Sequence, residues 1–93
     1  MKEIYERVLK GMKKTRPNDF ECLAGLTEEV GEWSLALRVE RGFKQRRLDE
    51  PSKNEAVDII LLAMEAYIHS GGTLEELPKI INTKLTKWEE LFS

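Results

Sequence analysis

The chain has 93 residues, which is enough for one domain, over residues 1–93, and leaves no room for a second core. A composition of 41% hydrophobic and 34% charged residues is typical of globular proteins and excludes a disordered chain. The net charge of −2 gives no overall attraction to nucleic acid or acidic membranes, so we expect neither as a partner. The chain has one cysteine, no signal-like apolar N-terminus and no apolar run long enough to cross a bilayer, so we expect a cytoplasmic protein.

Two helices are predicted in the first half of the chain. The first covers residues 2–14 and ends before Pro17, because proline disfavours helix in the residue that precedes it. Asn18 followed by Glu21 has the form of a capping box and predicts the start of the second helix, which we expect to end at Gly42. This second helix carries one apolar stripe, with steps of three and four residues, formed by Leu23, Leu26, Val30, Trp33 and Leu37.

The third helix follows a polar, basic connection over residues 43–51. Ser52 and Glu55 have the spacing of a second capping box. We therefore expect the helix to run from about residue 53 to residue 70, before two consecutive glycines.

A fourth helix is predicted near the C-terminus. Thr73 and Glu76 form a third capping signal, and Pro78 soon after it marks a kink or a late restart. The apolar stripe of this helix consists of Ile81, Leu85, Trp88 and Phe92. With no strand pattern anywhere, the sequence predicts an all-α fold of four helices.

The third helix is apolar around almost its whole circumference between residues 56 and 68. A helix of this kind must be buried on all sides, and three short partner helices do not enclose it. Small domains also gain stability by oligomerising. We therefore expect a four-helix bundle completed by homo-oligomerisation, as a dimer or a tetramer, around this helix.

Acidic residues form two clusters on the predicted helices. Glu29 and Glu32 lie three residues apart on the second helix, with Glu28 beside them, and Glu55 and Asp58 have the same spacing on the third. Side chains at this spacing share one face of a helix. Antiparallel packing of the two helices would bring four carboxylates around one small volume.

The commonest interpretation of such clusters is a solvated helix face, and Glu55 and Asp58 also fit as acids favoured near a helix N-terminus. Asp58, however, lies in the most apolar helix with no lysine or arginine three or four residues away, and an unpaired buried charge costs on the order of several kcal/mol. Like charges without a counter-ion take up protons or bind a cation. An all-carboxylate set suits Mg²⁺ or Mn²⁺, whereas zinc favours cysteine or histidine, of which the chain has only the distant Cys22 and His69.

The pattern Glu28-Glu29-x-x-Glu32, a gap of about twenty residues and then Glu55-x-x-Asp58 resembles the signature of MazG-like nucleoside triphosphate pyrophosphohydrolases. These enzymes belong to an all-α pyrophosphatase superfamily that includes dimeric dUTPases. The stretch over residues 26–33 looks like the usual helix of that family, and the likeness covers roughly residues 20–90.

This resemblance implies a MazG-like bundle that hydrolyses an NTP or dNTP, with Mg²⁺ or Mn²⁺, to the monophosphate and pyrophosphate. It assigns metal coordination to Glu29, Glu32, Glu55 and Asp58. Glu28 is then the candidate catalytic carboxylate, which orients water. Trp33 fits base stacking, although a core position is the commoner role for such a residue. Candidate phosphate-binding residues are Asn82, Lys84 and Lys87 on the last helix, and Lys44, Arg46 and Arg47 on the connection. A solvated turn is the commoner role for a basic connection of this kind.

Other classes of function stay open at this point. A non-catalytic dimerisation or regulatory module with the same fold would bind no divalent ion, whereas the enzyme would be stabilised by Mg²⁺ with a nucleotide. A nucleic-acid-binding bundle is disfavoured by the net charge and by the lack of a continuous basic face. Hydrolysis of another pyrophosphate compound at the same metal site is a third alternative.

Overall fold

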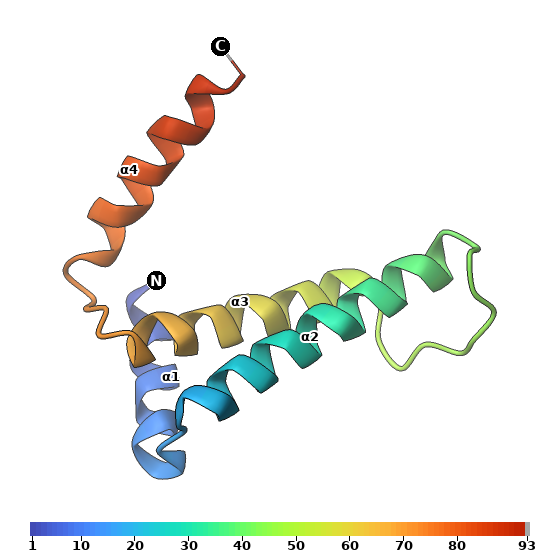
Figure 1. The fold of residues 1–93 in the computed structure, drawn as a ribbon, viewed down its shortest axis with the longest axis horizontal. Helices are drawn as coiled ribbons and strands as arrows, with labels where there is room; N and C mark the ends of the chain where they lie inside the picture. The colour runs from blue at the N-terminus through green and yellow to red at the C-terminus, as the bar shows by residue number, and fades with distance from the viewer. Residues whose placement is uncertain (93) are drawn as a thin grey trace.

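The computed structural model describes residues 1–92 and is entirely helical within them (Figure 1). The helices are α1 (Lys2–Thr15), α2 (Asp19–Glu40), α3 (Ser52–His69) and α4 (Leu77–Glu90). The prediction of an all-α fold of four helices is confirmed. None of the described helices combines the length and the apolar character that crossing a membrane requires.

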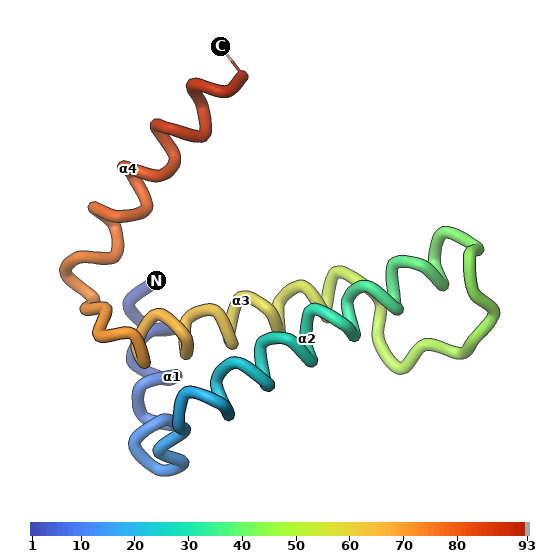
Figure 2. The backbone as a smooth tube through the Cα atoms, viewed as in Figure 1, coloured from blue at the N-terminus to red at the C-terminus, as the bar shows by residue number. Residues whose placement is uncertain are grey.

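Helices α2 and α3 lie side by side and antiparallel, and α1 packs across the end of α3 (Figure 1). Hydrogen bonds tie the α2–α3 pair at both ends, because Glu40 contacts Ser52 at one end and Asp19 contacts His69 at the other. Helix α4 points away from the other three, as the backbone trace shows, and within residues 1–92 it packs along none of them (Figure 2). The α2–α3 pair is therefore the frame on which any site must be built.

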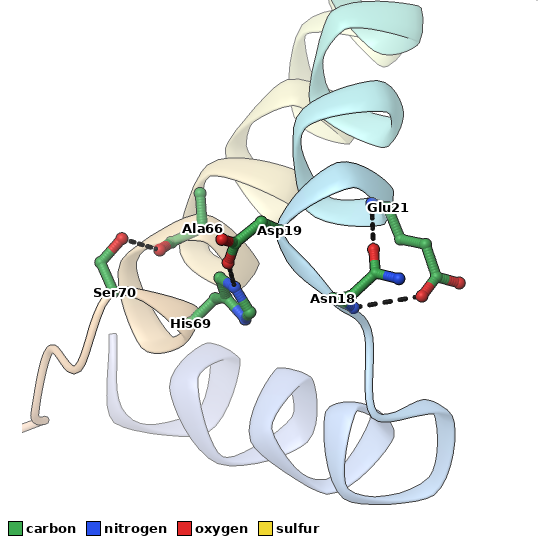
Figure 3. Close-up of polar contacts among 6 residues, drawn as sticks. All are labelled: Asn18, Asp19, Glu21, Ala66, His69 and Ser70. Carbon is green, nitrogen blue, oxygen red and sulfur yellow. Dashed lines mark hydrogen bonds and ion pairs between the residues drawn. The ribbon is translucent and has the colours of Figure 1, made fainter.

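The start of α2 follows the predicted capping box. The backbone N–H of Glu21 donates to Asn18 Oδ1 at 2.8 Å, and the backbone N–H of Asn18 donates to Glu21 Oε1 at 3.1 Å (Figure 3). Two N–H groups that lack partners at a helix start are satisfied in this way. Next to this cap, His69 Nε2 lies 2.6 Å from Asp19 Oδ1 and joins the end of α3 to the start of α2 (Figure 3).

The predicted capping box of Ser52 and Glu55 is wrong. Ser52 is the first residue of α3, Pro51 is the N-cap, and no side chain of that cap makes a hydrogen bond. The backbone N–H of Ser52 donates instead to Glu40 Oε2 at 2.7 Å, and the Ser52 hydroxyl donates to Glu40 Oε1 at 2.5 Å. The last residue of α2 thus caps α3 and closes the connection between them, which leaves the Glu55 side chain free for another role.

The segment before α4 resolves the choice between a kink and a late restart. Thr73 Oγ1 accepts from the backbone N–H of Glu76 at 3.2 Å and donates to Glu76 Oε1 at 3.0 Å. This contact stabilises a turn, and the helix itself restarts at Leu77 with Pro78 in its first turn, where proline is tolerated. Leu77 is buried, so the start of α4 is anchored although the rest of the helix projects outward.

The interior of the single chain is small. The buried hydrophobic side chains of the described residues are Cys22, Ala36, Met64 and Leu77. The accessible surface is 7436 Å², compared with about 5,500 Å² for a compact monomer of this mass. The radius of gyration is 15.7 Å, compared with about 12 Å for a compact chain of this length. The chain is therefore too open to bury its apolar residues by itself.

Gly72 is the glycine with the tightest surroundings. A Cβ atom at this position would fall onto the ring of Tyr67, whose hydroxyl donates to the Thr73 carbonyl at 2.7 Å. We expect Gly72→Ala to destabilise the fold by about 1–3 kcal/mol, as overpacking does. Gly11→Ala, in open space inside α1, should instead stabilise it by about 0.5–1 kcal/mol. Urea unfolding of both variants measures the difference, and equal stabilities would contradict this reasoning.

Candidate functional site

The pairing of α2 with α3 brings carboxylates from both helices together. One oxygen each from Glu29, Glu32 and Glu55 lies within 4.8 Å of the others. A second group with the same spacing contains Glu55, Asp58 and also Glu50. We call these five residues the carboxylate cluster. All four carboxylates that the sequence assigned to a metal are therefore members, and Glu55 belongs to both groups.

Glu50 was missed by the sequence analysis. It lies on the connection between α2 and α3, where no helical periodicity relates it to the other acids. Its position depends on the return of the chain to α3, which the Glu40–Ser52 contact secures. The local signal was its place just before α3, whose first two turns carry Glu55 and Asp58.

Burial and mutual repulsion act together in this cluster. Glu55 is 9% exposed, and its Oε2 atom is buried without a hydrogen-bond partner among the described residues, as is Oε2 of Glu29. Burial, and then the charge of Glu32, raises the pKa of both carboxyl groups. Asp58 adds to this effect on both, and Glu50 adds to it on Glu55. Unpartnered buried oxygens are uncommon in native proteins, and a bound ion is one explanation for them.

No member of the cluster forms an ion pair with another residue in the described part of the chain. The side-chain ion pairs found there join Arg7 to Glu3, at 3.6 Å, and His69 to Asp19. Several carboxylates within contact distance, two of them with spare buried oxygens, fit a hard divalent cation such as Mg²⁺. The residues that would hold it are Glu29, Glu32, Glu50, Glu55 and Asp58.

A cavity of about 200 Å³ opens beside the cluster. Three acids of the cluster, Glu32, Glu50 and Glu55, lie on its wall, together with two arginines of the connection, Arg46 and Arg47. Whole small-molecule ligands occupy pockets of roughly 300–1,000 Å³. The cavity has room for a few anionic groups and an ion, and a larger ligand would extend beyond it.

The other predicted site residues lie outside the cluster. Glu28 is exposed on α2, and its charge contributes to the raised pKa of Glu29. Trp33 is half-buried one residue after Glu32. The structure does not bring the α4 candidates to the carboxylates of their own chain, because α4 diverges after the turn that precedes it (Figure 1). These candidates are exposed along α4: Asn82, Lys84 and Lys87.

The raised pKa values predict that removing a charge from the cluster stabilises the metal-free protein but weakens metal binding. In the folded protein, Glu29 and Glu55 hold protons above their usual pKa of 4.5, so their contribution to stability is present below that pH and is lost as the pH rises through the raised values. At pH 7 we therefore expect Glu55→Gln to raise the Tm of the metal-free protein and to abolish the increase in Tm that Mg²⁺ gives. Calorimetry with and without Mg²⁺ tests this, and a lower metal-free Tm would contradict it.

Comparison of the chain with models of protein families, with curated proteins and with solved structures gives no match in any of the three.

Proposed function

We propose that this chain is a Mg²⁺-dependent nucleoside triphosphate pyrophosphohydrolase that acts as a homo-oligomer. The observation that carries the proposal is the pair of buried, unpartnered oxygens of Glu29 and Glu55 inside a cluster contributed by two facing helices. The MazG-like order of these acids in the sequence supports the choice of reaction. A cluster that raises its own pKa values destabilises the fold, and such an arrangement is typical of a functional site.

Each residue of the site has a defined task in this proposal. Bound Mg²⁺ would neutralise charge on the phosphate oxygens and lower the pKa of the attacking water. Glu29, Glu32 and Glu55 would hold the ion from both helices, with Asp58 extending the set on α3 and Glu50 extending it from the connection. The exposed Glu28 orients water at the edge of the cluster and takes up its proton. The products are the nucleoside monophosphate and pyrophosphate.

The homo-oligomer is supported by the apolar side chains that the single chain leaves in water. On α3, Val57 and Ile60 are each 51% exposed, although the helix is apolar on almost every side. The exposed large apolar residues of α4 and the segment after it are Ile80, Leu85, Trp88, Leu91 and Phe92. Exposed apolar side chains on two helices are typical of surfaces that a partner covers. We propose a dimer or tetramer in which a partner copy covers α3, and in which the exposed basic residues of α4 approach the substrate of that partner.

Pyrophosphate release with Mg²⁺ and each common NTP and dNTP is the decisive measurement. We expect release from at least one of these substrates, an increase in Tm with Mg²⁺ plus nucleotide, and loss of both when the metal is chelated. A protein that releases no pyrophosphate and gains no stability with Mg²⁺ would instead be the non-catalytic helical module. Release of phosphate from a different pyrophosphate compound would keep the metal site and change the substrate.

A further inference from the structure

The connection over residues 41–51 is held at both ends and passes beside the carboxylate cluster. Glu40, the last residue of α2, accepts two hydrogen bonds from Ser52, the first residue of α3, at 2.7 Å and 2.5 Å. These bonds lower the pKa of the Glu40 carboxyl group, so the contact persists at neutral pH. With its two ends joined, the connection returns to the site, where it supplies Glu50 to the cluster.

The same connection places two cations on the wall of the cavity next to the metal-binding acids. Arg46 and Arg47 line it together with Glu32, Glu50 and Glu55. Neither arginine forms a hydrogen bond or an ion pair with another residue in the described range 1–92. Their guanidinium groups therefore remain available to a ligand, although carboxylates lie on the same wall.

The net charge of the carboxylate cluster opposes the binding of an anionic ligand. The five carboxylates of the cluster carry a formal charge of −5 when ionised, and one divalent ion leaves −3; Asp49 is a further acid on the cavity wall. A polyphosphate is itself strongly anionic, so an ion alone does not make the cavity attractive to it. Arginine binds phosphate oxygens with two parallel hydrogen bonds and keeps its charge at every pH of interest.

From this arrangement we propose that Arg46 and Arg47 bind the polyphosphate chain of the substrate in the cavity beside the carboxylate cluster. This inference rests on the proposed function and names the groups that recognise the substrate's phosphates. The Glu40–Ser52 contact is the positioning element, since it holds the connection in place without touching the ligand. The cavity of about 200 Å³ takes the phosphate end, and the base and sugar extend beyond it.

The test is the double variant Arg46→Gln/Arg47→Gln, with Lys13→Gln/Lys14→Gln on α1 as a control that removes the same charge elsewhere. We expect the arginine variant to raise KM for the best nucleotide at least 10-fold and the lysine variant to leave it unchanged. Inorganic tripolyphosphate should inhibit the wild type competitively and lose that inhibition in the arginine variant. Mn²⁺ titration without nucleotide should show equal or tighter metal binding, because two repelling cations are gone.

Measuring tripolyphosphate binding directly separates the test of the arginines from the test of enzymatic activity. Calorimetric titration of tripolyphosphate in the presence of Mn²⁺ should show at least 10-fold weaker binding to the arginine variant, even if the wild type hydrolyses no nucleotide. Equal tripolyphosphate affinity in the two proteins would overturn the inference while leaving the proposed enzyme intact. A loss of Mn²⁺ binding in the arginine variant would also overturn it, since the arginines would then be shaping the metal site. Both arginines are exposed, and circular dichroism with the single variants Arg46→Gln and Arg47→Gln verifies that the fold is kept.

Discussion

Replacement of Asp58 by asparagine, or of Glu32 by glutamine, should lower kcat/KM for the best nucleotide by about 10²–10³-fold. Each substitution keeps the size of the side chain and removes one negative oxygen from the carboxylate cluster. The cluster has few other ways to hold a cation, because no histidine or cysteine lies among its members. The loss should therefore appear in Mg²⁺ affinity as well as in the rate. Pyrophosphate release measured across a range of Mg²⁺ concentrations separates the two effects.

The matched control is Glu6→Gln, which removes a carboxylate from an exposed position on α1. We expect it to retain the wild-type rate and the wild-type dependence on Mg²⁺. The decisive adverse result is an Asp58→Asn protein that keeps near wild-type activity at every Mg²⁺ concentration. That outcome would remove the cluster from the mechanism.

A charge introduced on the exposed face of α3 should have the second large effect. Ile60 is 51% exposed in the single chain and borders an apolar groove that includes Ala63, Tyr67 and Leu77. If a partner copy covers this groove, Ile60→Lys buries an unpaired charge at the interface, which costs on the order of several kcal/mol. We expect the oligomer to dissociate and the helical signal in circular dichroism to fall, because the separate chain has a small interior.

The accessible surface of the single chain is large enough to supply an interface between two copies. The chain exposes about 1,900 Å² more than a compact monomer of its mass, from 7436 Å² and about 5,500 Å². Twice that value, for a pair of chains, falls within the roughly 2,000–5,000 Å² typical of obligate homodimers. Lys10→Asp on α1 is the control, since it also changes charge at an exposed helical position. Light scattering that shows a stable, folded monomer for the wild type at micromolar concentration would contradict the expectation.

The sequence by itself determined the helices and the faces that carry the acids. Contacts within three or four residues encode these features, as the Asn18 and Glu21 capping box demonstrates. The spacing of Glu29 from Glu32, and of Glu55 from Asp58, likewise fixed a common face before any tertiary contact was known. Whether the two faces meet depends on the rotation of each helix about its own axis, which the packing of α2 against α3 decides.

Only the tertiary structure decided how the connection and α4 lie relative to this frame. Ser52 fits a local cap in the sequence, but its partner is Glu40, twelve residues away, and no local pattern distinguishes the two alternatives. This contact joins the two ends of the connection, which carries Glu50 of the cluster and the arginines on the cavity wall. The direction of α4 depends on a turn and on the buried Leu77, which its own helical periodicity does not encode. Helix propensity is a property of neighbouring residues, whereas the course of a connection depends on which distant groups satisfy each other's hydrogen bonds.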